Sequence, residues 1–209
     1  ILLVALGGNA LIRPGERGTC AEQFANLRRP MRQIARLTDR YRLIITHGNG
    51  PQVGNLLMQQ ESCAEVPAMP LEILVAQTQG QIGYMIESTL ESELLALGGE
   101  ERCLVSLISY VQVAEDDPAF RAPTKPIGPY YAAAEAARFA WPMVSTPRGF
   151  RRVVASPEPL TVVEKDEIQR LVEMDFIVVC CGGGGITVTR EGRAFYGVDA
   201  VIDKDLASR

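Results

Sequence analysis

The stretches Ile1–Gly8 (ILLVALGG) and Tyr41–Gly50 (YRLIITHGNG) decide the fold of this chain. Each is a run of apolar, partly β-branched residues that stops at glycine, a pattern typical of a strand buried on both faces. A third stretch, Phe176–Gly185 (FIVVCCGGGG), has the same form. Helical patterns lie between these runs, so strands alternate with helices. This order predicts an α/β fold with a mostly parallel sheet covered by helices.

Two of the expected helices have a start signal in the sequence. Thr19 and Glu22 have the spacing of a capping box, and apolar residues follow them at helical intervals. Thr161 and Glu164 repeat this spacing ahead of a helix that we expect to end near Met174. The remaining expected elements are a helix from Pro51 through Met58, a helix over 71–97, strands at 103–108 and 198–202, and a hairpin near 151–155.

Composition narrows the classes of partner. The 209 residues are 47% hydrophobic, and 21 basic and 25 acidic residues are mixed along the chain for a net charge of −4. No basic stripe is present, so we expect no nucleic-acid or membrane partner. The longest purely apolar run, Ile1–Leu6, is far shorter than the roughly 20 residues of a membrane-spanning helix. No cationic segment precedes it, as a signal peptide would require, and we expect a cytoplasmic protein.

The five cysteines follow no zinc or redox spacing, so we expect no metal site. We interpret them as buried small residues of a protein in a reducing compartment. They are Cys20, Cys63, Cys103, Cys180 and Cys181.

We expect one large domain over residues 1–209. Prolines and glycines become frequent over 116–159, and we interpret this segment as an irregular excursion or lid subdomain within that domain. The chain stops at Arg209, where a helix should begin, which suggests a C-terminal truncation.

Glycine turns follow the three expected strands. In a parallel sheet such turns lie on one edge, where ligands bind in open α/β folds. Glycine lets backbone N–H groups approach a ligand closely, and a following helix N-terminus favours negative charge. Each turn alone is more simply an ordinary tight turn, but three together predict a site for a small anion such as phosphate. The turns are Gly7-Gly8-Asn9, Gly48-Asn49-Gly50 and Gly182–Gly185, which includes Gly183 and Gly184. Neither a P-loop nor a dinucleotide-binding glycine spacing is present.

Only three of the basic residues are lysines. Lys125 lies between prolines, which makes a mobile surface lysine less probable, and Lys204 lies between Asp203 and Asp205. Phosphoryl transfer mainly needs positioning and positive charge along the path of the moving group, which two lysines oriented by an aspartate would supply. For Lys204 a surface ion pair explains the pattern equally well. Lys165 is interpreted as a solvated helix residue, and the pair Arg151-Arg152 as a charged strand edge rather than an anion clamp.

Seven motifs occur in order along nearly the whole chain. They are Leu6–Leu11 (LGGNAL), His47–Gly54 (HGNGPQVG), Gln79–Tyr84 (QGQIGY), Pro123–Tyr130 (PTKPIGPY), Arg151–Pro159 (RRVVASPEP), Cys181–Val188 (CGGGGITV) and Ala200–Asp205 (AVIDKD). Together they resemble carbamate kinase, a member of the amino acid kinase superfamily. The PTKPIGP segment in particular separates carbamate kinases from acetylglutamate, aspartate and uridylate kinases.

The resemblance implies a three-layer α/β/α sandwich, a homodimer, and reversible transfer between ATP with carbamate and ADP with carbamoyl phosphate. Mg²⁺ would act through the nucleotide phosphates. The implied catalytic residues are Lys125, Lys204 and Asp203. The implied substrate- and phosphate-binding residues are Gly7, Gly8, Asn9, Gly48, Asn49, Gly50, Gly183 and Gly184.

Two departures from the family pattern stand out. Thr187 occupies a position that is usually proline. Family members also continue past AVIDKD into the segment that supplies most of the nucleotide site, so we expect that part to be missing and the fragment to be weakly active or inactive.

Two other functions remain open. One is a non-catalytic, anion-binding regulatory subunit of the same superfamily, against which the intact set of Lys125, Lys204 and Asp203 argues. The other is a kinase of the same fold that acts on an amino-acid carboxylate, which the PTKPIGP segment disfavours.

Overall fold

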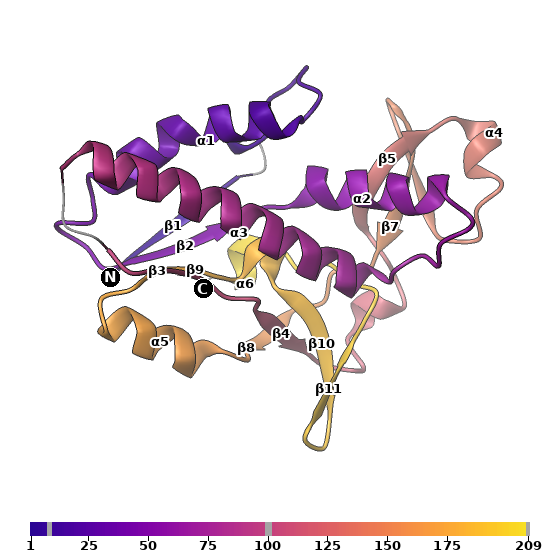
Figure 1. Cartoon of the computed structure of the whole chain (residues 1–209). Helices are drawn as coiled ribbons and strands as arrows, with labels where there is room; N and C mark the ends of the chain where they lie inside the picture. Colours follow the sequence, from indigo (N-terminus) through magenta and orange to yellow (C-terminus); the bar gives the residue numbers. More distant parts are fainter. Residues whose placement is uncertain (8–9, 99–101, 208–209) are drawn as a thin grey trace.

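The centre of the fold is a four-stranded parallel sheet (Figure 1). The computed structural model describes residues 1–7, 10–98 and 102–207, without the side chains of residues 204 and 205. The strand order in this sheet is β1-β2-β9-β3. Its strands are β1 (Leu2–Leu6), β2 (Leu43–His47), β9 (Ile177–Val179) and β3 (Leu104–Ser106). The strands expected from the three apolar stretches are therefore present, and they pair in parallel.

Helices cover both faces of this sheet, as Figure 1 shows. Helices α1 (Cys20–Ala35) and α3 (Leu71–Ala96) pack on one face, and α5 (Lys165–Glu173) lies on the other. The first interface buries side chains of β2, α1 and α3 completely, among them Leu27, Met31, Ile45, Ile82 and Ile86. Burying such side chains is the main favourable contribution to folding. The predicted three-layer α/β/α arrangement is confirmed around this sheet.

One of the two predicted capping boxes is present. At α1 the Glu22 backbone N–H donates to Thr19 Oγ1 over 3.3 Å, and the Thr19 N–H donates to the Glu22 carboxylate over 2.8 Å. The second prediction is wrong, because α5 begins after Glu164 and has no side-chain cap. Thr161 lies instead in β8 (Pro159–Val162), where it pairs with Gln112 of a neighbouring strand. The strand continues to Val162 and the helix begins only at Lys165, so Thr161 lies too far before the helix start to cap it.

A second sheet, with strand order β11-β10-β4-β8, extends below the first (Figure 1). The remaining strands are β4 (Tyr110–Val113), β10 (Ile186–Glu191) and β11 (Ala194–Gly197). The β10–β11 hairpin was not predicted. The strand expected at 198–202 is also wrong, since only an isolated bridge between Ala155 and Ala200 forms there. Thr187 stands at a position that is usually proline in the family. Its hydroxyl donates a 3.2 Å hydrogen bond to the Ala200 carbonyl.

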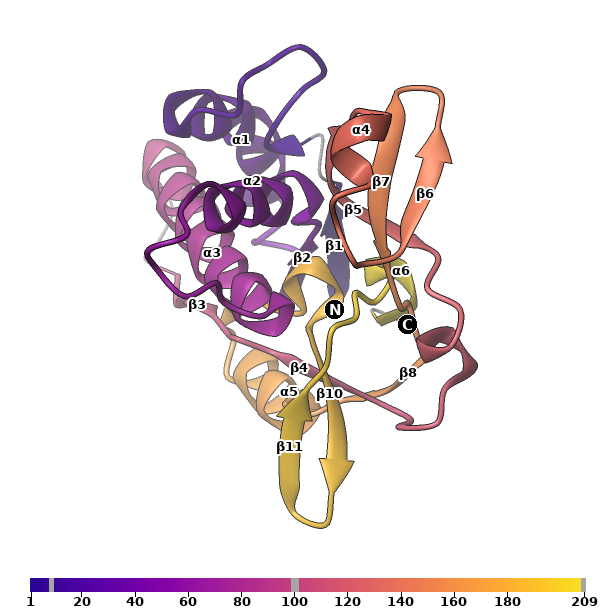
Figure 2. The same ribbon diagram turned by 90° about the vertical axis from the view of Figure 1, so that its right-hand side faces the viewer.

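The segment 116–159 contains a three-stranded antiparallel sheet beside the main body (Figure 2). Its strands are β5 (Lys125–Tyr131), β6 (Met143–Thr146) and β7 (Gly149–Val154), with the short helices η2 (Pro118–Phe120) and α4 (Ala133–Ala136) nearby in sequence. Strands β6 and β7 form the hairpin expected in this region. Helix α2 (Gly50–Ser62) packs against β5 through two glycines, Gly54 of the helix and Gly128 of the strand. The two backbones approach closely at this point, where a Cβ on Gly54 would lie 3.5 Å from the Gly128 Cα.

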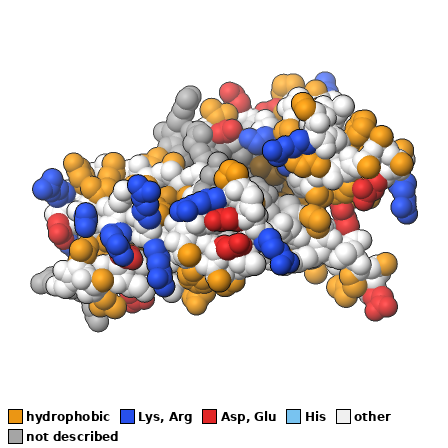
Figure 3. Space-filling view, turned by 90° about the horizontal axis from the view of Figure 1, so that it is seen from above, with side chains coloured by type: hydrophobic (Ala, Val, Ile, Leu, Met, Phe, Trp, Pro, Cys, Tyr) orange, Lys and Arg blue, Asp and Glu red, His pale blue; other side chains and the backbone are white. Residues whose placement is uncertain are grey.

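The surface carries both signs of charge. Viewed from above, basic and acidic side chains are interspersed with apolar ones (Figure 3). In the described parts of the chain, no helix combines the length and the apolar character needed to cross a membrane.

The interpretation of the cysteines is wrong for three of the five, since only Cys180 and Cys181 are buried. Cys20, Cys63 and Cys103 are exposed.

Candidate active site

The turns after β1, β2 and β9 lie together at one edge of the parallel sheet. The Gly48 N–H donates to the Leu6 carbonyl over 2.8 Å, which joins the first two turns. The Thr46 hydroxyl donates to the Cys181 carbonyl over 3.1 Å, which joins the second turn to the third. This convergence follows from parallel pairing, because the carboxyl ends of all three strands point the same way.

The third turn forms the short helix η3 (Gly182–Gly184), and its backbone requires glycine. Gly183 has φ +68, and a Cβ there would overlap the side-chain amide of Asn49. Gly184 has φ +91, and its Cβ would press on the Ile202 carbonyl oxygen. Left-handed backbone conformations cost a side chain roughly 1–2 kcal/mol even without such contacts. The glycines therefore let the turn pack directly against α2 and the segment before α6 (Lys204–Ala207).

A buried hydrogen-bond network supports this turn from below. Gln79 Nε2 donates to the carbonyls of Ser109 and Gly182 over 3.2 and 3.1 Å, and Gln79 Oε1 accepts from the Ser109 N–H over 2.8 Å. The Ser109 hydroxyl accepts from the Cys181 N–H over 3.1 Å. Each of these buried polar groups has a hydrogen-bond partner, so its burial avoids the free-energy cost of an unpaired polar group. Sequence reasoning missed this role of Gln79, although the residue stands in a motif and lies on the buried face of α3.

Asn49 begins α2 and is held by a residue of α3. Its side chain is buried, and Asn49 Nδ2 donates to Thr78 Oγ1 over 2.9 Å. The Thr78 hydroxyl in turn donates to the Val75 carbonyl over 2.8 Å. Sequence reasoning did not single out Thr78. A threonine on a buried helix face, opposite a predicted binding residue, was the available signal.

His47, the single histidine, ends β2 behind this site. Its side chain is 1% exposed, and Nδ1 lies 3.2 Å from the Gly48 carbonyl oxygen. Burial disfavours the charged imidazolium and lowers the pKa of His47 to about 4, although the Gly48 carbonyl opposes the shift. The imidazole is therefore neutral near pH 7.

Lys125 and Asp203 face each other across the opening of the site. Lys125 Nζ lies 3.2 Å from Asp203 Oδ2, and the side chains are 35% and 41% exposed. Strand β7 and its continuation position both residues: Val154 pairs with Lys125 on one side, and Ala155 accepts the Val201 N–H over 3.0 Å on the other. Two segments 78 residues apart are thus brought to the same pocket.

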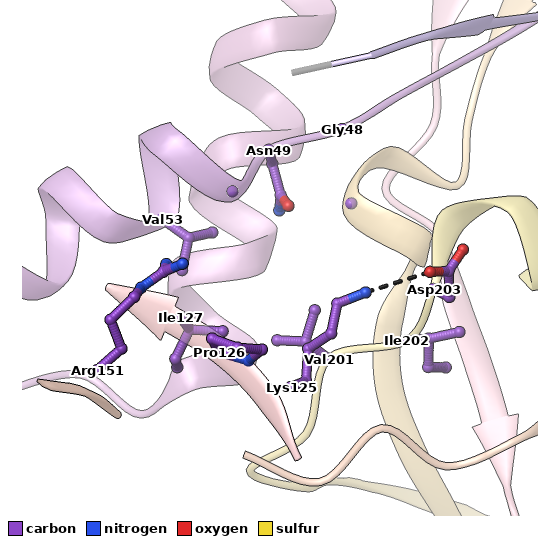
Figure 4. Close-up of a pocket in the computed structure, with 12 residues that line it drawn as sticks. Gly48, Asn49, Val53, Lys125, Pro126, Ile127, Arg151, Val201, Ile202 and Asp203 are labelled. Carbon is purple, nitrogen blue, oxygen red and sulfur yellow. Dashed lines mark hydrogen bonds and ion pairs between the residues drawn. The ribbon is translucent and has the colours of Figure 1, made fainter. Parts of the chain in front are cut away.

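These elements enclose a pocket of about 220 Å³ (Figure 4). The Arg151 guanidinium lines one side and donates to the Gly128 carbonyl through Nε over 3.1 Å and through Nη2 over 2.8 Å. Sequence reasoning favoured a strand edge for Arg151 and did not place it in a pocket. The lining residues are Gly48, Asn49, Gly50, Val53, Lys125, Pro126, Ile127, Arg151, Gly183, Val201, Ile202 and Asp203.

Most of the residues predicted for the site meet in this pocket. Six of them line it: Gly48, Asn49, Gly50, Gly183, Lys125 and Asp203. Gly7 and Gly184 lie in the adjoining turns without lining the pocket. Gly8 and Asn9 lie outside the described residues. Lys204 begins α6, and its side chain is likewise outside the description.

The arrangement suits a small anion, which positive charges and fixed groups around the pocket would hold in place. The N-terminus of the 13-residue helix α2 points its partial positive charge at the pocket, and the positive charges of Lys125 and Arg151 outweigh the single negative charge of Asp203. Within the described residues, no group of three or more His, Cys, Asp or Glu side chains could hold a metal ion.

Comparisons with known proteins agree with this geometry. The amino acid kinase family model matches residues 1–208. The chain is 45% identical to the carbamate kinase of Pyrococcus furiosus and 42% identical to that of Escherichia coli K12, over 99% of this chain and 68% of each relative. A solved carbamate kinase from Giardia lamblia, bound to AMP-PNP, is 38% identical with a TM-score of 0.88. That match covers 99% of this chain and 67% of the Giardia chain.

The chain thus spans about two thirds of the length of these relatives. Within that span, the matches in sequence and in three-dimensional structure extend over 99% of this chain. The chain therefore belongs to the amino acid kinase family and, within it, to the carbamate kinases.

Proposed function

We propose that the pocket between α2, η3 and β5 binds carbamoyl phosphate, and that the phosphoryl group moves there between carbamate and a nucleotide. The reaction is the reversible conversion of ATP and carbamate into ADP and carbamoyl phosphate. The single observation that carries this proposal is the meeting of Lys125 with the helix start at Asn49 and Gly50 in one pocket. A phosphorylated small molecule is the ligand class that this charge pattern favours.

We assign the following roles to the residues of the pocket. The Lys125 ammonium stabilises the negative charge of the transferring phosphoryl group, and Asp203 orients it through their 3.2 Å ion pair. The backbone of Gly48 and Gly50 and the start of α2 bind the phosphate oxygens. The assignment of Gly7, Gly8 and Asn9 to the same task, and of Lys204 as a second positive charge, is supported by the motifs of the family alone.

Magnesium enters this proposal only with the nucleotide. The described residues hold no cluster of metal ligands, and Asp203, the carboxylate in the pocket, is paired with Lys125. These residues do not fit a resident metal ion. We therefore assign Mg²⁺ to the nucleotide phosphates and assign no step to a metal held by the protein.

The working protein is proposed to be a cytoplasmic homodimer. Membership in the carbamate kinases supports the dimer. The reducing cytoplasm suits a protein whose five cysteines are all free thiols in the structure. Sedimentation of the complete protein would test the dimer directly.

A coupled assay tests the proposed activity. The complete protein is mixed with carbamoyl phosphate, ADP and Mg²⁺, and ATP formation is followed through hexokinase and glucose-6-phosphate dehydrogenase. We expect ATP to form, and we expect aspartate and acetylglutamate to accept no phosphoryl group from ATP. No ATP from carbamoyl phosphate would favour a non-catalytic binding subunit, whereas transfer to aspartate or acetylglutamate would favour a kinase of amino-acid carboxylates.

A further inference from the structure

The hydroxyl group of Thr78 determines which end of the Asn49 amide faces the pocket. Thr78 is fully buried, and its hydroxyl donates its proton to the Val75 carbonyl over 2.8 Å. A hydroxyl carries one proton, so toward any second partner Thr78 Oγ1 can only accept. The contact of 2.9 Å with Asn49 therefore requires the NH₂ end of the amide to face Thr78.

The other end of the amide, Asn49 Oδ1, is left for the pocket. Asn49 is 5% exposed, lines the pocket, and has its side-chain amide against Gly183 at a place where no Cβ would fit. Figure 4 shows the side chain pointing toward the space that Lys125 and Asp203 also face. Among the described residues, the hydrogen bonds of this amide are limited to the one with Thr78.

A fixed acceptor oxygen does not suit a phosphate, which offers acceptors of its own. The pocket already supplies positive charge for a phosphate through Lys125 and the start of α2. A carbonyl oxygen in the same pocket instead matches a ligand group that donates a hydrogen bond. In carbamoyl phosphate that donor is the NH₂ group, whereas acetyl phosphate has a methyl group of similar size at the same position.

We propose that Asn49 Oδ1 accepts a hydrogen bond from the amino group of the substrate and so selects carbamate over carboxylates of the same shape. Thr78 is the positioning residue that locks the amide in the selective orientation. This inference rests on the proposed function, since it concerns how the same pocket recognises carbamoyl phosphate. A site built to hydrogen-bond a substrate group discriminates strongly against an analogue that lacks it.

Two stable phosphonates test the inference by binding alone. Phosphonoacetamide carries the NH₂ group, and 2-oxopropylphosphonate carries a methyl group in its place, with the bridging oxygen replaced by methylene in both. Their dissociation constants are measured by titration calorimetry on the complete protein, its Thr78→Val variant and its Thr78→Ser variant. Valine matches threonine in shape but removes the hydroxyl, whereas serine retains the hydroxyl.

We expect the wild-type protein to bind phosphonoacetamide at least about tenfold more tightly than the methyl ketone, which is the effect of one hydrogen bond. Thr78→Ser keeps this ratio. Thr78→Val lowers it toward one and changes the affinity for the ketone little, because the amide can then turn its NH₂ end to the pocket. If Thr78→Val unfolds at a lower temperature than the assay requires, Asn49→Leu supplies the same comparison and is expected to remove the preference.

Three outcomes would contradict the inference. A wild-type ratio near one, with both ligands bound, would overturn the inference and leave the proposed function standing. An unchanged ratio in a folded Thr78→Val protein would overturn the role of Thr78. Failure of both phosphonates to bind the wild-type protein would overturn the proposed function and, with it, the selectivity built on it.

Discussion

Replacing Gly183 with alanine tests how the third glycine turn is held against α2. Gly183 has φ +68, and the new Cβ would occupy the position of the Asn49 amide. Asn49 cannot move aside freely, since it is buried and bonded to Thr78 over 2.9 Å. The substitution therefore combines backbone strain with the loss of a buried hydrogen bond.

The expected cost has two parts. A left-handed backbone conformation costs an alanine roughly 1–2 kcal/mol relative to glycine. Displacing Asn49 leaves buried polar groups unpaired, which costs a further 1–3 kcal/mol or so. Gly192→Ala is the matched control, because Gly192 has φ +59 and nothing lies within 4 Å of the position its Cβ would take. It should show the first part alone.

Urea denaturation of the wild-type protein and both variants measures these costs as free energies of unfolding. Gly183→Ala should be less stable than Gly192→Ala by about 1–3 kcal/mol. It should also bind phosphonoacetamide more weakly, whereas Gly192→Ala should bind it normally. Equal stability of the two variants would refute the packing of Gly183 on Asn49.

Two further predictions concern stability away from the pocket. Thr19→Ala removes the capping box of α1 and should lower the free energy of unfolding by about 1 kcal/mol in urea denaturation, whereas Thr161→Ala should cost less because no helix cap forms there. Equal losses of stability in Thr19→Ala and Thr161→Ala would contradict the assignment of a helix cap to Thr19 alone. The pKa of His47 is about 4 in the folded protein, below its ordinary value of 6.5, so its stabilising effect is complete above pH 6.5 and is lost as the pH falls toward 4. This difference of 2.5 pKa units corresponds to about 3 kcal/mol. The free energy of unfolding should therefore fall between pH 7 and pH 4 by about 3 kcal/mol less in His47→Gln than in the wild type. Parallel pH profiles of the two proteins would contradict this role of His47.

The parallel sheet and its glycine turns could be predicted because their signals are local. Each strand is a short apolar run, and each turn follows it directly in the sequence. Once three such strands pair in parallel, their turns must share an edge, so the neighbourhood of Gly48 and Gly183 follows from pattern alone. The capping box at Thr19 was predictable for the same reason, since all of its contacts lie within three residues.

The failures come from contacts between distant segments. Thr161 has the local pattern of a helix cap, but pairing with Gln112 places it in a strand. The 198–202 run has the composition of a strand, but it forms only the bridge at Ala200. Tertiary contacts override local preference at both positions.

The contacts between side chains within the site could not be predicted from the sequence either. The ion pair of Lys125 with Asp203 depends on β7 lying between their two segments, and no local spacing encodes that arrangement. The same holds for the bond between Thr78 and Asn49, which joins residues 29 apart on different helices. The motifs named Asn49, Lys125 and Asp203, but which atoms face one another had to come from the structure.

The most direct test of the central claim compares two lysine variants of the complete protein. ATP formation from carbamoyl phosphate and ADP is measured for the wild-type protein, for Lys125→Met, and for Lys165→Met as a control on the exposed start of α5. We predict that Lys125→Met lowers kcat by about 10²–10³-fold, as loss of a group that stabilises transition-state charge does, while unfolding within about 1 kcal/mol of the wild type. Lys165→Met should match the wild type in both measurements. Unchanged turnover in Lys125→Met would contradict the claim that phosphoryl transfer takes place in this pocket.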